Sequence, residues 1–357
     1  MRRIRRLIHP RPSAAPRAPL AGGALLFLLL CGALVAGRAL APAAAAAGGP
    51  SEPAPSTGQK REVAVTFVSF PGNDGFDAAR HAETTRKLLR ALGAERIEAV
   101  AFVNEARFYK ADGTPGEARV QLLKDWLDAG HELGNETFGH RNLYQVSVEE
   151  FQASVLRGEQ LMSKLARDRG RRLRYFSYPY LNTGPNLAAK SSVEQFLRGR
   201  GYEIHPVTID NMDWLFSRAY REALERGDER GAAAVRAEYV PYMERMFEFF
   251  EGYSREVVGR EFPQVLMLTA GALNADTFPE LAAMLRRRGY SFVTMEQATK
   301  DAAYRLPDTY TGLRGDSWIA RWAVTKGLEY KDSEENLPPL MERYFAEFMR
   351  KQAAKSK

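Results

Sequence analysis

A series of short apolar runs separated by amphipathic segments constrains the fold of this 357-residue chain most strongly. Residues 63–68, 99–103 and 265–268 are almost purely apolar and rich in β-branched residues, as in strands buried on both faces of a parallel sheet. Helix-like patterns fill the intervals. The alternation predicts an α/β domain, and about seven such units favour a closed barrel with functional residues on the loops after the strands.

The same patterns predict the individual elements and the domain boundaries. Strands are expected at 63–68, 99–103, 132–135, 174–178, 202–209, 265–268 and 291–294, and helices at 77–92, 117–129, 148–169, 191–200, 214–260 and 276–288. The barrel is assigned to 62–301. Residues 214–260, broken near Gly227 to Gly231, are interpreted as a helical insertion, and 302–357 as a C-terminal extension packed on the barrel.

The N-terminal segment accounts for the net positive charge of the protein. Residues 1–47 contain seven arginines and no acid, and subtracting these seven from the 51 basic residues leaves 44, equal to the number of acidic residues. The remainder is formally neutral, so the charge gives no reason to expect nucleic-acid binding.

The same segment has the layout of an export signal. The arginines precede an apolar run at 20–37 and the small residues Ala44, Ala45 and Ala46. We expect residues 1–47 to be a signal peptide or, alternatively, an uncleaved inner-membrane anchor. The globular part would then be exported, periplasmic or extracellular, with no membrane contact beyond the leader. Residues 48–61 are expected to be a flexible linker, and the single cysteine, Cys31, leaves the body without a disulfide.

The stretch from Gly134 to His140 reads Gly-Asn-Glu-Thr-Phe-Gly-His. It resembles the second motif of the polysaccharide deacetylase (NodB-like) family, Asn-His-Thr-x-Ser/Gly-His, in which two histidines bind a divalent metal such as zinc. Glu136 replaces the first histidine and His140 matches the second. The resemblance extends over roughly 62–350 and implies an irregular (β/α)7 barrel. If any metal is held, it implies Glu136 and His140 as weak or vestigial ligands.

The other motifs of the resemblance are mostly substituted. The base and the metal carboxylate of the first motif are replaced by Val68 and Ser69, neither of which supplies a carboxylate. The third motif keeps Pro-Tyr but has Ser177 in place of its arginine. Thr269 stands where relatives carry a catalytic histidine.

The fourth motif is retained as Asp210-Asn211-Met212-Asp213-Trp214. Asp213 and His140 are therefore the retained catalytic positions. A substrate groove is expected to include Asn135, Tyr180, Asp210 and Trp214. Asp213 is expected either to be unpaired, to hold substrate hydroxyls, or to cap the following helix.

These substitutions, set in an otherwise undisturbed scaffold, predict an exported pseudoenzyme that binds a polysaccharide or peptidoglycan-like glycan, with hydrolysis lost or strongly impaired. Three alternatives remain open. One is an active amide or ester hydrolase with a metal site rebuilt around Glu136, His140 and Asp213. Another is a serine hydrolase using Ser69 and His140, although no Gly-x-Ser-x-Gly elbow surrounds the serine. The third is a non-enzymatic structural protein of the cell envelope.

Overall fold

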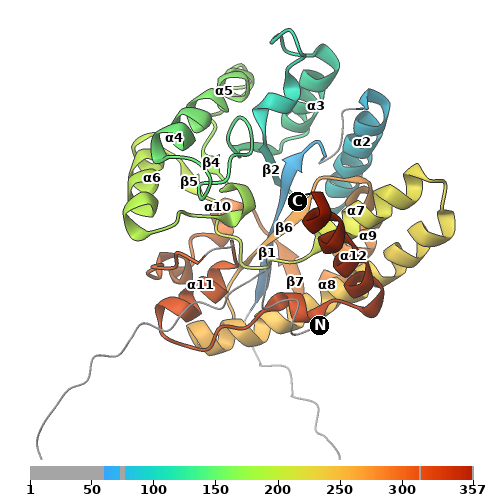
Figure 1. The fold of residues 1–357 in the computed structure, drawn as a ribbon, viewed down its shortest axis with the longest axis vertical. Helices are drawn as coiled ribbons and strands as arrows, with labels where there is room; N and C mark the ends of the chain where they lie inside the picture. The colour runs from blue at the N-terminus through green and yellow to red at the C-terminus, as the bar shows by residue number, and fades with distance from the viewer. Residues whose placement is uncertain (1–59, 73–76, 313–314, 356–357) are drawn as a thin grey trace, which may run out of the picture. The chain divides into compact units, whose positions relative to one another are not determined.

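The structure, a computed structural model, describes residues 60–72, 77–312 and 315–355 (Figure 1). The predicted leader, residues 1–47, and nearly all of the predicted linker, 48–61, lie outside the described residues. Within the described ranges, no helix is both long enough and apolar enough to cross a bilayer.

Within the described residues, seven strands form one parallel sheet. They are β1 (Arg61–Phe70), β2 (Val100–Val103), β3 (Glu132–Asn135), β4 (Tyr175–Phe176), β5 (Glu203–Ile204), β6 (Gln264–Thr269) and β7 (Tyr290–Phe292). Their order is β5-β4-β3-β2-β1-β6, and β7 pairs with the first residues of β1. Beyond β5, a bridge from Ile209 to Leu266 joins the two ends of the sheet. The prediction of a parallel α/β sheet curled into an irregular barrel is confirmed.

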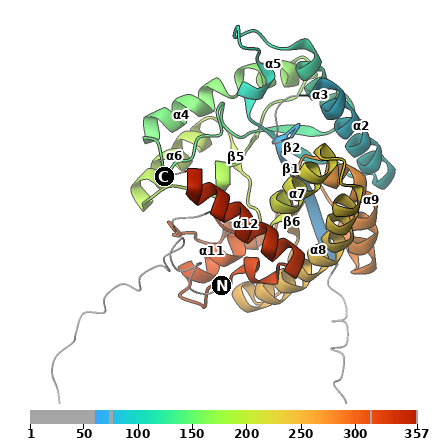
Figure 2. The same cartoon turned by 45° about the vertical axis from the view of Figure 1, so that its right-hand side comes forward.

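Helices surround the sheet (Figures 1 and 2). They are α2 (Ala78–Glu95), α3 (Glu117–Asp128), α4 (Val148–Arg157), α5 (Gln160–Arg167), α6 (Leu187–Gly199), α7 (Asp213–Glu225), α8 (Glu229–Val258), α9 (Ala272–Arg287), α10 (Met295–Ala298), α11 (Trp318–Thr325) and α12 (Pro339–Lys355). The described part of the chain also contains four short 3-10 helices: η1 (Glu105–Phe108), η2 (Pro179–Leu181), η3 (Ala302–Arg305) and η4 (Ser333–Asn336). Local sequence sets several boundaries. For example, the carboxylate of Asp77 caps α2 by accepting from the N–H of Arg80, at 2.8 Å.

Aromatic packing fixes the centre of the core beside β1. Phe67 and Phe70 are fully buried and contact Trp126 of α3, with ring centroids 5.8 and 5.1 Å apart. Burying a phenylalanine ring contributes about 1.5–3 kcal/mol. The packing holds the C-terminal end of β1, where two of the substituted motif positions lie.

The single helix predicted over 148–169 is wrong, because the backbone forms α4 and α5 with a break at Gly158 and Glu159. The break has a steric cause. A Cβ at position 158 would lie 2.6 Å from the backbone nitrogen of Phe138 and 2.6 Å from the carbonyl carbon of Thr137. The second-motif loop therefore presses against this glycine, and the N–H of Phe138 donates to the carbonyl of Ser154 at 2.9 Å.

The stretch predicted as a helical insertion forms α7 and α8, separated at residues 226–228. The break comes slightly earlier than expected, because Asp228 caps α8 through the N–H of Gly231, at 2.8 Å, and places Gly231 inside the helix. The two helices pack against each other and against α9.

The C-terminal segment packs on the barrel through buried aromatic and charged groups. Trp322 of α11 is buried and contacts Phe262, with ring centroids 5.9 Å apart. Asp308 accepts from the buried Lys190 of α6, with an N–O distance of 2.8 Å, and from the buried Arg321. A buried carboxylate with two cationic partners makes this attachment costly to break.

Candidate functional site

The substituted motif positions gather at the end of the barrel where the strands terminate. Val68 and Ser69 lie in the last three residues of β1, Glu136 follows β3, Ser177 follows β4, and Thr269 ends β6. Val68 and Thr269 are register partners on neighbouring strands. This is the end at which barrels of alternating strands and helices place their functional residues.

The backbone is unusual at this end. Within the described residues, six non-glycine residues have positive φ, and five of them lie in these loops: Ser69, Thr137, His140, Tyr180 and Leu181. Ser69 also falls where the pairing of β1 with β2 shifts register, as at a β-bulge. Such conformations cost of order 1–3 kcal/mol each and are held only by the surrounding structure. The loops therefore keep a specifically shaped site although its side chains have changed.

The side chain of Glu136 connects the second-motif loop to Ser69 and to His140. Its carboxylate is buried, and Oε2 accepts the backbone N–H of Ser69 at 3.0 Å. Its Oε1 lies 3.3 Å from Nε2 of His140. The His140 ring in turn contacts the ring of Tyr180, with centroids 4.5 Å apart. The imidazole thus faces Glu136, which gives the Ser69–His140 hydrolase alternative no support.

Asp213 is fully engaged inside the protein. Its Oδ2 accepts the backbone N–H of Thr269 at 2.6 Å and the side-chain amide of Asn274 at 2.8 Å. Its Oδ1 accepts the hydroxyl of Thr269 at 2.8 Å. Burial raises the pKa of Asp213 to about 6, and the hydrogen bonds oppose that shift. The expectation of an unpaired or substrate-holding Asp213 is therefore wrong. Asp213 does not cap α7 either, because the helix begins at Asp213 itself and the cap position is Met212.

Ser177 takes part in a buried series of polar contacts through the barrel interior. Its Oγ lies 3.1 Å from Nδ1 of His205, and Nε2 of His205 lies 2.9 Å from Oγ1 of Thr66. Thr66 donates its hydroxyl to the carbonyl of Leu266, so it must accept from His205. The imidazole is therefore protonated on Nε2 and accepts from Ser177. Burial lowers the pKa of His205 to about 3, which keeps the ring neutral.

Arg174 does not substitute for the missing third-motif arginine. Its guanidinium pairs with Glu132 and Glu296, with N–O distances of 2.7 Å in both cases. It therefore points away from Ser177, as the odd offset along the strand predicts.

The residues at the metal position do not fit a catalytic divalent ion. Among the described residues, the donors at this position are one carboxylate, Glu136, which already accepts from Ser69, and one imidazole, His140. Within the described ranges no group of three or more His, Cys, Asp or Glu side chains converges to hold a metal. Zinc sites ordinarily take three or four protein ligands. Asp213, hydrogen-bonded to Thr269 and Asn274, does not complete the set as the rebuilt-site alternative requires.

The four residues expected to form the groove have different environments. Tyr180 is 59% exposed and stands over His140. Trp214 is half-buried, and its ring contacts the ring of Phe348 of α12, with centroids 5.6 Å apart. Asp210 is half-buried. Asn135 is fully buried and donates to the carbonyl of Val155 and the hydroxyl of Tyr202, so its assignment to the groove is wrong.

Sequence reasoning missed several residues of this region. His205 lies at the centre of the buried polar contacts, and Arg80, His81, Arg218 and Arg221 line a cavity next to Thr269. Arg218 and Arg221 could have been predicted to lie near the site, because they follow Trp214 of the retained fourth motif at helical spacing. His205 could not have been predicted in this way, since a single histidine after a short strand predicts no contact.

Comparison with known proteins shows a family likeness over part of the chain. Residues 56–195 match the model of the polysaccharide deacetylase family. The chain is 26% identical to the peptidoglycan-N-acetylglucosamine deacetylase of Bacillus cereus over 155 residues, which is 43% of this chain and 47% of that protein. The alignment thus spans about half of that relative.

Solved structures with a related backbone path include two Bacillus proteins. One is a CE4 family pseudoenzyme from Bacillus anthracis, 14% identical, with a TM-score of 0.44 over 67% of this chain and 65% of that one. The other is a peptidoglycan deacetylase from Bacillus subtilis, 18% identical, with a TM-score of 0.43 over 69% of this chain and 93% of that one.

Proposed function

We propose that this protein is an exported glycan-binding member of the polysaccharide deacetylase family that has lost metal-dependent hydrolysis. One observation carries the proposal. At the family's metal position, the carboxylate of Glu136 is held by the backbone N–H of Ser69. A carboxylate that accepts a backbone hydrogen bond from a neighbouring loop stabilises the conformation of that loop. The same hydrogen bond leaves the carboxylate poorly placed to complete a metal site.

Tyr180 supports the glycan-binding part of the proposal. It is one of few large exposed hydrophobic side chains among the described residues, and it sits with positive φ over His140 at the site end of the barrel. Exposed aromatic faces offer apolar area to the faces of pyranose rings. The glycan is proposed to be N-acetylated, in keeping with the family, and peptidoglycan-like. Export is supported by the basic, apolar and small-residue layout of residues 1–47.

Calorimetric titration with chitooligosaccharides and peptidoglycan fragments tests the proposal. Tyr180→Ala is expected to weaken binding about tenfold or more, whereas Tyr180→Phe keeps the ring and should change binding little. Leu187→Ala, at another exposed apolar side chain, is the matched control. An acetate-release assay on the same glycans is expected to show no turnover. Turnover by the unmodified protein, or glycan binding indifferent to Tyr180→Ala, would overturn the proposal.

A further inference from the structure

The last helix, α12, packs beside α7, the helix that begins at the retained fourth motif (Figures 1 and 2). The ring of Phe348 contacts the ring of Trp214, with centroids 5.6 Å apart and planes at 66°. One turn further along α7, the guanidinium of Arg218 lies over the Phe348 ring, 4.8 Å from its centroid. Two turns along, the hydroxyl of Tyr344 donates to Oε2 of Glu222 at 2.8 Å. α12 therefore follows one stripe of α7, formed by residues 214, 218 and 222.

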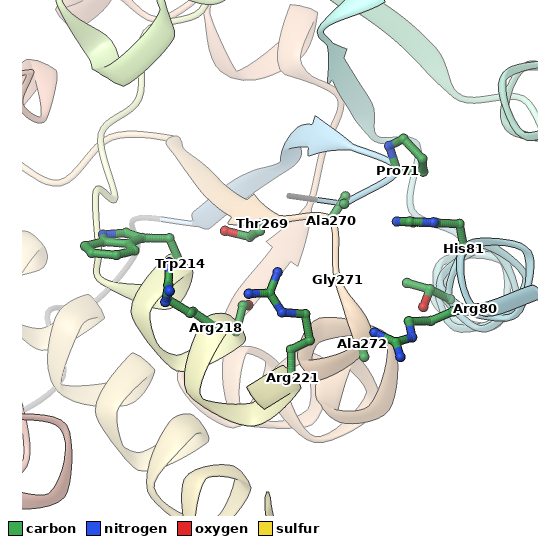
Figure 3. A pocket seen from close by; sticks show the side chains of 13 residues that line it. Pro71, Arg80, His81, Trp214, Arg218, Arg221, Thr269, Ala270, Gly271 and Ala272 are labelled. Carbon is green, nitrogen blue, oxygen red and sulfur yellow. The ribbon is translucent and has the colours of Figure 1, made fainter. Parts of the chain in front are cut away.

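The same stripe borders a cavity at the site end of the barrel. The cavity has a volume of about 130 Å³ and lies between α2 and α7, with the turn from β6 into α9 as its floor. Figure 3 shows Trp214 and Arg218 on one helix, next to Thr269 at the end of β6. Trp214 and Arg218 line this cavity and also contact Phe348. Phe348 thus covers part of an aromatic side chain at the end of the barrel where the motif positions gather.

The attachment of α12 is deepest at its first turn. Leu337, just before the helix, and Met341, within its first turn, are buried. After Met341, each side chain that the structure describes in α12 is half-buried or exposed. Helical segments with few buried apolar side chains open at a lower free energy than the core does. The part of α12 from residue 344 to 354, called the strap below, can therefore leave α7 while Met341 stays in the core.

A sugar and the strap would use the same aromatic surface. An indole ring has a large apolar face, and such faces stack on pyranose rings. With the strap docked, Phe348 occupies one side of the Trp214 ring, which is half-buried as a result. Tyr180 has no such cover and is 59% exposed. Contact between a glycan and the covered side of Trp214 therefore requires that Phe348 move away.

We propose that the strap is autoinhibitory: docked on α7, it withholds Trp214 from the glycan, and glycan binding displaces it. The inference rests on the proposed function, because the glycan is the ligand that competes with Phe348. Tyr180 is accessible in both states, whereas Trp214 adds its contact only when the strap is released. The apparent affinity for glycan is then reduced in proportion to the fraction of molecules in which the strap is released. Variants that release the strap should bind glycan more tightly.

Two alanine variants of the full-length protein test the cover over Trp214. Phe348→Ala removes an aromatic pair, which shifts the equilibrium toward the released strap about two- to tenfold. Glu347→Ala is the matched control, because Glu347 is an exposed neighbour that pairs with Lys351 of the same helix. Acrylamide quenching of tryptophan fluorescence reports mainly Trp214. The other three tryptophans of the protein are buried: Trp126, Trp318 and Trp322.

Quenching is expected to rise in Phe348→Ala and to stay at the parent's level in Glu347→Ala. Equal quenching by the two variants would overturn the strap. Hydrogen exchange of the parent protein then tests displacement. A saturating chitooligosaccharide should speed amide exchange of the strap about two- to tenfold and leave α11 unchanged. Exchange in the strap that stays constant or slows on binding would refute displacement.

Calorimetric titration with the same chitooligosaccharide tests the competition. Phe348→Ala is expected to bind about two- to tenfold more tightly than the parent, and Glu347→Ala as tightly as the parent. In a Trp214→Ala background, Phe348→Ala should no longer improve binding, because no covered ring remains to be exposed. If the parent binds through Tyr180 and Phe348→Ala binds no more tightly, the strap is refuted and the proposed function stands. If neither the parent nor Phe348→Ala binds any glycan, the proposed function is refuted and this inference with it.

Discussion

The hydroxyl of Thr269 donates to the carboxylate of Asp213 at 2.8 Å, so the residue at the family's acid position now holds the retained acid of the fourth motif in place. Asn274 and the backbone N–H of Thr269 complete the shell of donors. The fourth and fifth motif positions therefore meet in space through a buried hydrogen bond.

The raised pKa of Asp213 predicts that this carboxyl lowers stability as pH rises. The folded state binds the proton up to about pH 6, whereas the unfolded protein releases it near 3.9. The stabilising contribution of protonated Asp213 to the free energy of unfolding is therefore complete below about pH 4. It is lost as pH rises through 6, and the loss is on the order of 3 kcal/mol. Asp213→Asn should remove this slope. Urea unfolding from pH 4 to 7 measures it, and an unchanged slope would contradict the assignment.

His205 predicts the opposite dependence. The pKa of His205 is lowered to about 3 in the folded protein and lies near 6.5 in the unfolded protein. The contribution of neutral His205 to the free energy of unfolding is therefore complete above pH 6.5 and is lost as pH falls toward 3. His205→Gln can still donate to Thr66 and accept from Ser177 without titrating. We expect the variant to be less stable at pH 7 but to lose less stability on acidification. Parallel unfolding curves at pH 4.5 and 7 provide the measurement. An acid sensitivity equal to the parent's would rule His205 out.

Gly158→Ala is expected to destabilise the protein by about 1–3 kcal/mol, because its Cβ would overlap the backbone of Thr137 and Phe138. The matched control is Gly199→Ala at the end of α6, where a Cβ meets nothing within 4 Å and helix propensity should make the change neutral or stabilising by up to about 1 kcal/mol. Denaturant melts compare the two. Equal effects would show that the loop does not press on Gly158.

Ser69→Asp combined with Glu136→His is expected to create zinc binding that the parent protein lacks. The double variant supplies a carboxylate and a second imidazole beside His140, giving the three protein ligands that zinc sites use. Asp tolerates the positive φ of 57° at position 69 better than most residues. Metal content after dialysis against a mild chelator is the measurement. One zinc retained by the parent protein would contradict the prediction, and His140→Ala would then show whether His140 holds it.

Acetate release should require three further changes together: Val68→Asp, Thr269→His and Ser177→Arg. Base and acid groups contribute about 10²–10⁴-fold each, but act as a set with the metal, so partial combinations should remain almost inactive. Ser177→Arg should cost the most stability, because Ser177 is buried against His205. If the fivefold variant folds, binds zinc and still releases no acetate from acetylated glycans, then the loops have diverged along with the motif residues.

The pattern of apolar residues along the sequence predicted much of the fold. The apolar runs at 63–68, 99–103 and 265–268 predicted β1, β2 and β6, because a strand covered on both faces needs apolar residues at consecutive positions. The retained Asp-x-x-Asp-Trp segment also located Asp213 at the site end. The break at Gly158 escaped prediction, because its cause is a loop twenty residues earlier in the sequence and not a local preference.

The sequence by itself determined the alternation of strands and helices, the resemblance to the polysaccharide deacetylase family, and the identities of the substituted motif residues, since each depends on local pattern. Only the tertiary structure decided the partners of those residues. Asp213 accepts a hydrogen bond from Thr269, Ser177 contacts His205, and Arg80 of α2 lines the same cavity as Arg221 of α7. These partners are 28 to 141 positions apart in the sequence, and hydrogen bonding and charge act over a few ångströms of space, a separation that only the closed barrel sets.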